Sequence, residues 1–191
     1  MSTPFTFDPS IAPPVLPESD VSYAVVETEV GRLVLAAADR RLVLCAYAAD
    51  DEAESTLLTR VAEAVSPRVL RRPASLDDAR RQVDDYLHGG RRVFDLETSL
   101  VLASPFQREV LGGLGATAYG QTTTYGELAG RIGRGGASRA VGTALGTNPL
   151  CIVLPCHRVL PAGGSVGGRV GGYAGGIGAK EKLLTIEAAA G

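Results

Sequence analysis

The sequence predicts an α+β protein in which an antiparallel sheet with flanking helices precedes a mostly helical C-terminal domain. In the first half, three segments rich in Val, Leu and Tyr follow one another across turn residues, and two segments with helical spacing come next. The second half carries helix-start signals, glycine-rich turns and a Pro-Cys-His-Arg (PCHR) segment. The 191 residues are enough to bury a sizeable core.

The N-terminal elements can be placed from turn and capping signals. The expected strands span residues 21–28, 31–38 and 41–48. A helix is expected over 51–65, where Leu57 and Val61 share one apolar face. A second helix is expected to begin at Ser75, with Asp78 as its capping-box partner, and to end at the Gly-Gly pair 89–90.

The C-terminal domain has stronger helix signals. Ser104 followed by Pro predicts a first helix, and Thr124 with Glu127 forms a capping box that predicts a second. The glycine-rich stretch 133–136 ends that helix, and a third is expected over 137–146. Two short helices across such a turn have the outline of a helix-turn-helix. A closing helix is expected over 179–189, after a glycine-rich loop.

Composition and the chain ends suggest the organisation and the compartment. Residues 1–20 hold five prolines and predict a flexible tail before an N-terminal domain, 21–100, and a C-terminal domain, 101–191. No apolar run approaches the roughly 20 residues that span a membrane, and no signal-peptide pattern is present. Three cysteines then suggest free thiols in the cytoplasm.

Charge is divided unevenly along the chain. Residues 1–100 carry 11 basic and 17 acidic side chains, whereas residues 101–191 carry 8 and 4. The second half could therefore meet a polyanion. Its third helix would turn Arg139, Gly142 and Thr143 outward, which suits close approach to DNA or, alternatively, a tight contact with another helix.

Cys156 and His157 carry the candidate chemistry. A thiol becomes a strong nucleophile as a thiolate, and an adjacent His can take its proton directly or through water. Residues 150–154 are expected to form a buried strand leading into Pro155, on which Cys151 would face away from Cys156. A Cys-His pair alone is weak, because most buried cysteines are inert and Cys45 is a further example.

The order of several motifs is much more specific. They are Tyr119-Gly120-Gln121-x3-Tyr125-Gly126-Glu127, Arg139-Ala140-Val141-Gly142, Asn148-Pro149, Pro155-Cys156-His157-Arg158-Val159, Tyr173-Ala174-Gly175-Gly176 and Lys180-Glu181-x5-Glu187. This arrangement resembles the O6-alkylguanine-DNA alkyltransferases, also called methylated-DNA–protein-cysteine methyltransferases. The resemblance is strong over residues 104–187 and loose over 21–100, where it implies a ribonuclease H-like sheet.

The resemblance implies catalytic roles for five residues. Cys156 corresponds to the alkyl acceptor, His157 to the residue that deprotonates it through a water, and Glu187 to the acid that polarises this His. Asn148 corresponds to the hinge between the recognition helix and the active-site strand. Tyr125 corresponds to a tyrosine that helps to rotate the nucleotide out and assists at the base.

The resemblance also implies DNA and substrate contacts. Arg139 corresponds to a finger that enters the base stack, and Tyr173 to a wall of the base pocket. Val159 would offer its carbonyl to the exocyclic amine of guanine. The remaining expected residues are Ala140, Gly142 and Thr143 against DNA, and Ala174 and Pro155 at the pocket.

The implied reaction is irreversible repair. The damaged base would be flipped out of double-stranded DNA, and its O6-alkyl group would pass to sulfur as a stable thioether, with O4-alkylthymine as a further candidate substrate. The resemblance implies a monomer that needs no cofactor. No metal is expected, since Cys45 and His88 are too few N-terminal ligands for a zinc site.

The glycine-rich loop 163–172 is about four residues longer than in this family, and no Trp follows Phe106-Gln107. The extra residues either loosen the lid over the base, which would favour bulky adducts such as benzyl, or bulge into solvent.

Three other functions remain open at this stage. A lesion-binding relative without transfer activity would lack Cys156, a helix-turn-helix regulator would use an inert Cys, and a Cys-His hydrolase would need an oxyanion hole.

Overall fold

The computed structural model describes residues 20–189, so the expected tail at 1–20 lies outside the described residues apart from Asp20. Strands β1 (Val21–Thr28), β2 (Gly31–Ala38) and β3 (Arg41–Tyr47) form an antiparallel meander. A fourth strand, β4 (Val69–Arg71), pairs parallel with β1, which gives the order β3-β2-β1-β4. The predicted fold class is confirmed, although the sheet is mixed and not wholly antiparallel. Strand β4 was not predicted, because three residues are too few to show the alternation of a strand.

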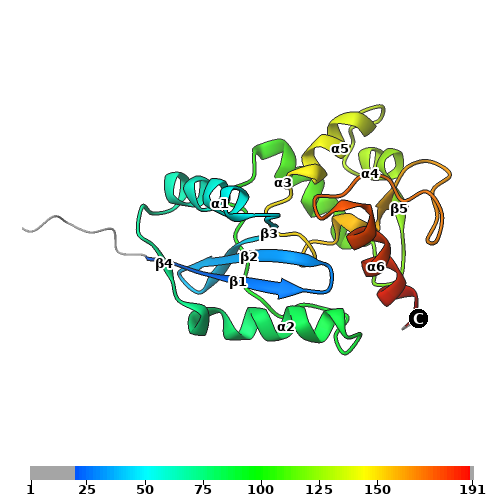
Figure 1. Cartoon of the computed structure of the whole chain (residues 1–191). Helices are drawn as coiled ribbons and strands as arrows, with labels where there is room; N and C mark the ends of the chain where they lie inside the picture. The colour runs from blue at the N-terminus through cyan, green and yellow to red at the C-terminus, as the bar shows by residue number, and fades with distance from the viewer. Residues whose placement is uncertain (1–19, 190–191) are drawn as a thin grey trace, which may run out of the picture.

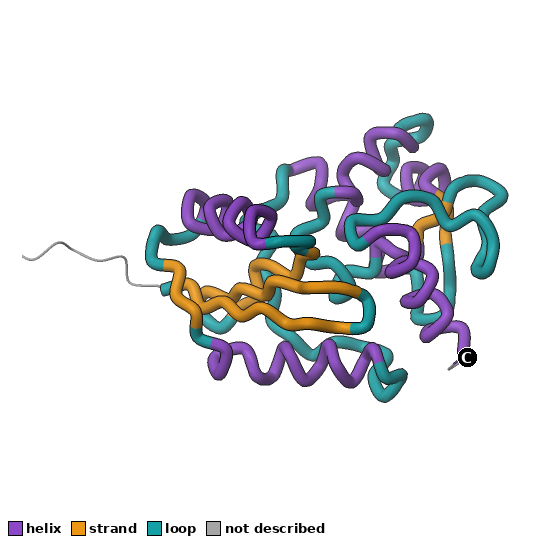
Figure 2. The backbone as a smooth tube through the Cα atoms, in the orientation of Figure 1, coloured by secondary structure: helices purple, strands orange, loops and turns teal. Residues whose placement is uncertain are grey.

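The two N-terminal helices cover opposite faces of this sheet (Figures 1 and 2). Alternation along β2 explains this arrangement, since successive side chains point to opposite faces. Val34 packs in one apolar cluster with Val61 of α1 (Asp51–Ala64). Leu35 packs in another with Val83 of α2 (Asp77–Leu87).

The start of α2 corrects the sequence prediction. Pro73 opens a 3₁₀ turn, Pro73–Leu76, and α2 follows it directly at Asp77. Ser75 therefore lies inside a helical turn and caps nothing, and Asp78 binds Arg81 instead. The predicted end is confirmed, with Gly89 at φ +74°.

The C-terminal part contains the expected helices. The predicted capping box of Thr124 with Glu127 is present at α4 (Tyr125–Arg131), and Ser104 forms a further one with Gln107 at α3 (Pro105–Gly113). A 3₁₀ turn, Leu114–Ala116, follows α3. Helix α5 (Ser138–Gly146) buries Val141, Ala144 and Leu145 and leaves Arg139 exposed, as expected.

The predicted strand over 150–154 is wrong. Cys151 N–H donates to the Cys45 carbonyl at 2.7 Å, but the chain then turns, with Leu154 N–H on the Leu150 carbonyl at 2.8 Å. Ile152 has φ +71° in this turn. An apolar run shows burial but does not distinguish a strand from a buried turn, which is why the pattern misled.

The turn leads into a short 3₁₀ helix, Cys156–Arg158, and then β6 (Val159–Leu160), which pairs parallel with β5 (Thr123–Thr124). Helix α6 (Gly176–Ala189) begins three residues before the expected start at 179. The loop between β6 and α6 projects at the edge of the molecule farthest from the sheet (Figures 1 and 2).

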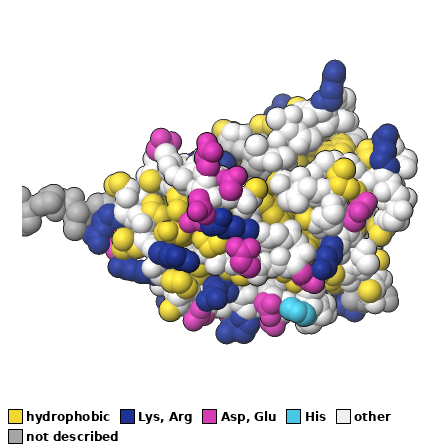
Figure 3. Space-filling model, viewed as in Figure 1, with side chains coloured by type: hydrophobic (Ala, Val, Ile, Leu, Met, Phe, Trp, Pro, Cys, Tyr) yellow, Lys and Arg dark blue, Asp and Glu magenta, His cyan; other side chains and the backbone are white. Residues whose placement is uncertain are grey.

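Charged side chains of both signs crowd the N-terminal part, and few lie on the C-terminal half of the face in Figure 3. Within residues 20–189, no helix is both long and apolar enough to cross a membrane.

Candidate functional site

Cys156 lies at the start of the 3₁₀ helix with only 4% of its surface exposed. The side-chain amide of Asn148 contacts the Cys156 sulfur directly. Nδ2 of Asn148 donates to Cys156 Sγ at 3.1 Å and to the Leu154 carbonyl at 3.0 Å, and Oδ1 accepts from Leu150 N–H at 3.0 Å. The amide is thus held so that its donor points at the sulfur.

The three buried cysteines differ in acidity. A hydrogen bond from Cys151 is the largest influence on the pKa of the Cys156 thiol and lowers it, burial opposes this, and Asn148 and Lys180 lower it further. Burial raises the pKa of Cys45 to about 12, and the hydrogen bond with Cys156 raises that of Cys151. Cys156 is therefore the thiol that the surroundings favour as thiolate.

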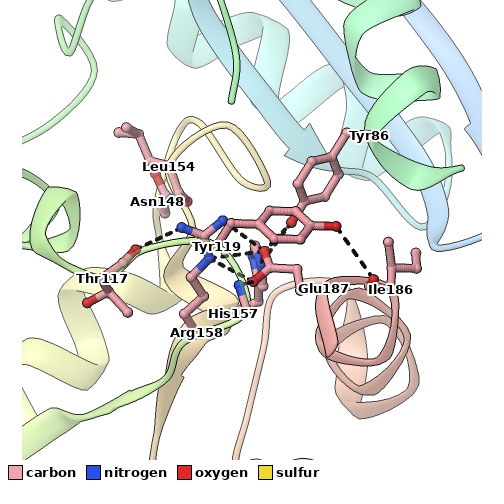
Figure 4. Close-up of polar contacts among 10 residues, drawn as sticks. Tyr86, Thr117, Tyr119, Asn148, Leu154, His157, Arg158, Ile186 and Glu187 are labelled. Carbon is pink, nitrogen blue, oxygen red and sulfur yellow. Dashed lines mark hydrogen bonds and ion pairs between the residues drawn. The ribbon is translucent and has the colours of Figure 1, made fainter. Parts of the chain in front are cut away.

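A buried polar network surrounds Glu187 and includes His157, the residue that follows Cys156 in the sequence (Figure 4). His157 Nε2 lies 2.8 Å from Glu187 Oε1, and Arg158 Nε lies 2.9 Å from Oε2. Gly120 N–H donates to Oε2 at 2.9 Å, and the Tyr86 hydroxyl donates to Oε1. Burial acts to raise the pKa of Glu187, but the hydrogen bonds from His157, Arg158 and Tyr86 outweigh it and lower that pKa to about 2.

Glu187 is therefore a carboxylate, and this fixes the state of His157. Burial lowers the pKa of His157 more than its bond to Glu187 raises it, so the ring is neutral at pH 7. A carboxylate accepts only, so Nε2 carries the hydrogen. Nδ1 is then an acceptor, and it has no hydrogen-bond partner among residues 20–189. Such a nitrogen can take a proton.

Two residues of the site were missed by sequence reasoning. Tyr86 comes from α2, and its signal was a phenol on the buried face of a predicted helix, where the hydroxyl needs a partner. Lys180 of α6 is 1% exposed and donates from Nζ to the Val159 carbonyl at 2.7 Å. Burial lowers its pKa to about 8. Lys180 belongs to the last family motif, but the sequence did not indicate that its ammonium group is buried.

A cavity of about 610 Å³ opens beside Cys156. Seven of the expected site residues line it: Tyr125, Arg139, Gly142, Thr143, Cys156, Tyr173 and Ala174. Three do not. Pro155 faces a separate groove with Arg158, Val159 is fully buried with its carbonyl on Lys180, and Ala140 is exposed on α5 outside the lining.

The longer loop touches the cavity only at its end. Gly172 lines it, whereas residues 165–168 are exposed and lie outside the lining. Val170 anchors the loop in a small buried cluster with Leu160 and Leu184. Residues 165–168 therefore face solvent, and the expected preference for bulky adducts has no basis in the lining.

Deleting residues 165–168 should leave substrate preference unchanged. A Cβ built on Gly164 would lie 2.5 Å from the Arg169 carbonyl oxygen, so the two ends to be joined are already close. We expect the benzyl-to-methyl rate ratio to stay within about twofold of the unaltered protein, as for other surface changes. Transfer rates on O6-benzylguanine and O6-methylguanine duplexes check this, and a shift of the ratio toward methyl would restore the lid hypothesis.

Comparisons with known proteins agree with this fold. Residues 21–100 match the family model of the 6-O-methylguanine DNA methyltransferase ribonuclease-like domain, and residues 105–189 match that of the DNA binding domain. The methylated-DNA–protein-cysteine methyltransferase of Mycolicibacterium paratuberculosis is 38% identical over 167 residues, which are 87% of this chain and 92% of that protein.

Two further relatives show the same relation. The Salmonella typhimurium methylated-DNA–protein-cysteine methyltransferase is 45% identical over 94 residues, covering 49% of this chain and 53% of that protein. The crystal structure of Mycobacterium tuberculosis OGT in complex with DNA superposes with a TM-score of 0.73 at 32% identity, over 88% of this chain and 94% of that one.

These matches define a DNA-repair methyltransferase class, and they cover most of the chain. The chain belongs to the methylated-DNA–protein-cysteine methyltransferase family. Its activity is alkyl transfer from methylated DNA to a protein cysteine, so the alternatives of a regulator, a hydrolase and a transfer-inactive relative are set aside. No group of three or more His, Cys, Asp or Glu able to hold a metal ion occurs within residues 20–189.

Proposed function

We propose that Cys156 accepts the alkyl group from O6-alkylguanine in duplex DNA, once per protein molecule. One observation carries the proposal: the thiol that its neighbours favour as thiolate is also the one that lines the cavity with Arg139 and Tyr173. A site of about 610 Å³ falls within the usual range for a bound small molecule and is large enough to admit a nucleobase.

The proposed step is a direct displacement. The Cys156 sulfur attacks the saturated carbon attached to O6, a carbon–sulfur bond forms, and the carbon–oxygen bond breaks. His157 Nδ1 takes the thiol proton, directly or through water, and Glu187 stabilises the cation that forms. The guanine oxygen keeps the bonding electrons and must be stabilised or protonated, and Tyr125 and Lys180 lie nearby as donors. The thioether product is stable, so the protein is consumed without a cofactor.

Base flipping is part of the proposal because O6 lies inside the duplex. Helix α5 would face the DNA as the second helix of a helix-turn-helix, with Ala140, Gly142 and Thr143 allowing close approach. A Cβ built on Gly142 would lie 3.7 Å from the Tyr125 ring, an ordinary van der Waals distance, so Gly142 lies beside the first residue of α4. Arg139 is exposed at the rim of the cavity, where it can enter the space that the base leaves.

Arg139→Ala should slow repair of duplex DNA by about 10- to 100-fold, because extruding a base costs a few kcal/mol and the side chain offsets part of this. Reaction with free O6-benzylguanine, which needs no flipping, should stay within about twofold. Arg134→Ala is the matched control. Arg134 lies in the turn before α5, pairs with Glu109 of α3 and is outside the cavity lining. Equal slowing of Arg139→Ala on both substrates would exclude a role in flipping.

Titration with duplex DNA tests the function itself. An O6-methylguanine duplex should be repaired up to one lesion per protein molecule, and a second addition should give no further repair. Continued turnover would contradict single use. A matched O4-methylthymine duplex tests the second candidate lesion.

We also propose that residues 21–100 and 101–191 are separate domains and that the protein works as a monomer in the cytoplasm. Three free buried thiols within the described residues support a reducing compartment.

A further inference from the structure

Cys151 is buried in the same apolar cluster as Cys156 and lies outside the cavity lining. Cys151 and Cys156 are 1% and 4% exposed. Asn148 contacts both: its Nδ2 donates to Cys156 Sγ at 3.1 Å, and its carbonyl accepts from Cys151 Sγ at 3.4 Å. A strand over 150–154 would have separated the two thiols, whereas the observed turn brings them together.

The backbone holds Cys151 in this place from both sides. Its N–H donates to the Cys45 carbonyl of β3 at 2.7 Å, and its own carbonyl accepts from Val153 N–H at 2.8 Å. Ile152, the next residue, is held at φ +71°, which reverses the chain. Cys151 Sγ therefore has little freedom to move away from Cys156.

We propose that Cys151 is a positioning residue, whose S–H donates a hydrogen bond to Cys156 Sγ and holds this sulfur as a thiolate aimed into the cavity. The inference deepens the proposed function and rests on Cys156 as the acceptor. The family motifs assign no role to Cys151. They include Asn148 and Cys156 but not residue 151.

The hydrogen bond from Cys151 is expected to be strongest when Cys156 is a thiolate, before transfer. The Cys151 S–H donates to the Asn148 carbonyl at 3.4 Å, and the nearby Cys156 sulfur is the alternative acceptor, whose pKa a hydrogen bond from Cys151 lowers. Bonds to charged acceptors are about twice as strong as neutral ones, so a thiolate draws the hydrogen toward itself. A thioether is a weak acceptor, and the bond is lost in the product. Stabilisation is thus largest before transfer.

Of the two thiols, Cys151 is the one that keeps its proton. The bond raises the pKa of Cys151 and lowers that of Cys156, so Cys151 stays a donor. The other titratable or charged groups around Cys156 are Lys180 from α6, Tyr125 from α4, Cys45 and Tyr47 from β3, Tyr173 and His157. Lys180 acts through its charge, whereas burial raises the pKa of Cys45 and of the three tyrosines and keeps them neutral.

The test compares variants at Cys151 by their pH profiles. Cys151→Ala and Cys151→Val remove the donor, and Val keeps apolar volume; Cys151→Ser keeps a donor. Reaction with free O6-benzylguanine should be about tenfold slower at neutral pH in the first two, because a hydrogen bond to a charged group shifts a pKa by about one unit. The deficit should vanish at high pH, and Cys151→Ser should recover most of the rate. Cys45→Ala removes a buried sulfur of equal size and should keep the unaltered profile.

Ultraviolet titration of the thiolate gives a second readout that needs no alkyl transfer. The lowest thiol transition should move up by about one pH unit in Cys151→Ala and Cys151→Val but not in Cys151→Ser. Unchanged transitions and rate profiles in folded Ala and Val variants would overturn the proposal, as would a Ser variant as impaired as Ala. Failure of Cys156 as acceptor would appear separately, as alkylation elsewhere, and leaves this titration interpretable.

Discussion

Cys156→Ala should abolish alkyl transfer while the protein still binds DNA. No other thiol in the described residues can substitute, because Cys45 and Cys151 are at most 1% exposed, lie outside the cavity lining and have raised pKa values. Alanine removes one atom beyond Cβ, so the helices that would face DNA keep their packing. Transfer from a labelled O6-methylguanine duplex should fall below detection, and the affinity measured by fluorescence anisotropy should stay within about twofold.

Cys45→Ala serves as the control for loss of a buried sulfur and should retain full transfer. A Cys156→Ala protein that still acquires methyl groups from DNA would refute the assignment of the acceptor.

Glu187→Gln should give the second largest loss, about 10- to 100-fold at neutral pH, with little change in DNA affinity. The amide keeps the size of the side chain but no longer stabilises a protonated His157, whose Nε2 lies 2.8 Å away. Raising the pH should shrink the deficit, because the Cys156 thiol then ionises without a base. The matched control is Glu181→Gln, an exposed carboxylate on the same helix. A rate equal to that of the unaltered protein at every pH would remove Glu187 from the mechanism.

The same variant should also change stability with a defined pH dependence. The pKa of Glu187 is lowered to about 2 in the folded protein, against about 4.3 for a free glutamate. Its ionised form therefore stabilises the fold fully above about pH 4.3, and this contribution is lost as the pH falls toward 2. Thermal unfolding should show a deficit for Glu187→Gln at neutral pH, where Arg158 loses its buried partner, and a smaller deficit near pH 3.

Local signals predicted the parts of the fold that local chemistry decides. Capping residues at Ser104 and Thr124 act over three positions, so their helices could be placed from sequence. β4 and the turn at 150–154 depend on partners far along the chain, Val21 for the first and Cys45 for the second. No local pattern contains such pairings.

The site residues likewise separate into those that sequence motifs indicate and those that depend on distant contacts. The family motifs indicated Cys156, His157, Arg139 and Tyr173. In the structure Cys156, Arg139 and Tyr173 line one cavity, and His157 is fully buried outside its lining. Tyr86 was missed because its contribution comes from 71 and 101 residues away, at His157 and Glu187. Pro155 and Val159 share the acceptor's segment, but the 3₁₀ turn rotates them away from the cavity.

The most direct test of the central claim is the location of the transferred methyl group. The protein is incubated with an O6-methylguanine duplex, cleaved with trypsin and analysed by mass spectrometry. Cleavage after Arg139 and Arg158 leaves Cys151 and Cys156 on one peptide, 140–158, so fragmentation must separate the two. The account predicts one added methyl group on Cys156 and none on Cys151 or Cys45. A methyl group on either of the other thiols, or an unmodified peptide from a reaction in which the DNA was repaired, would contradict it.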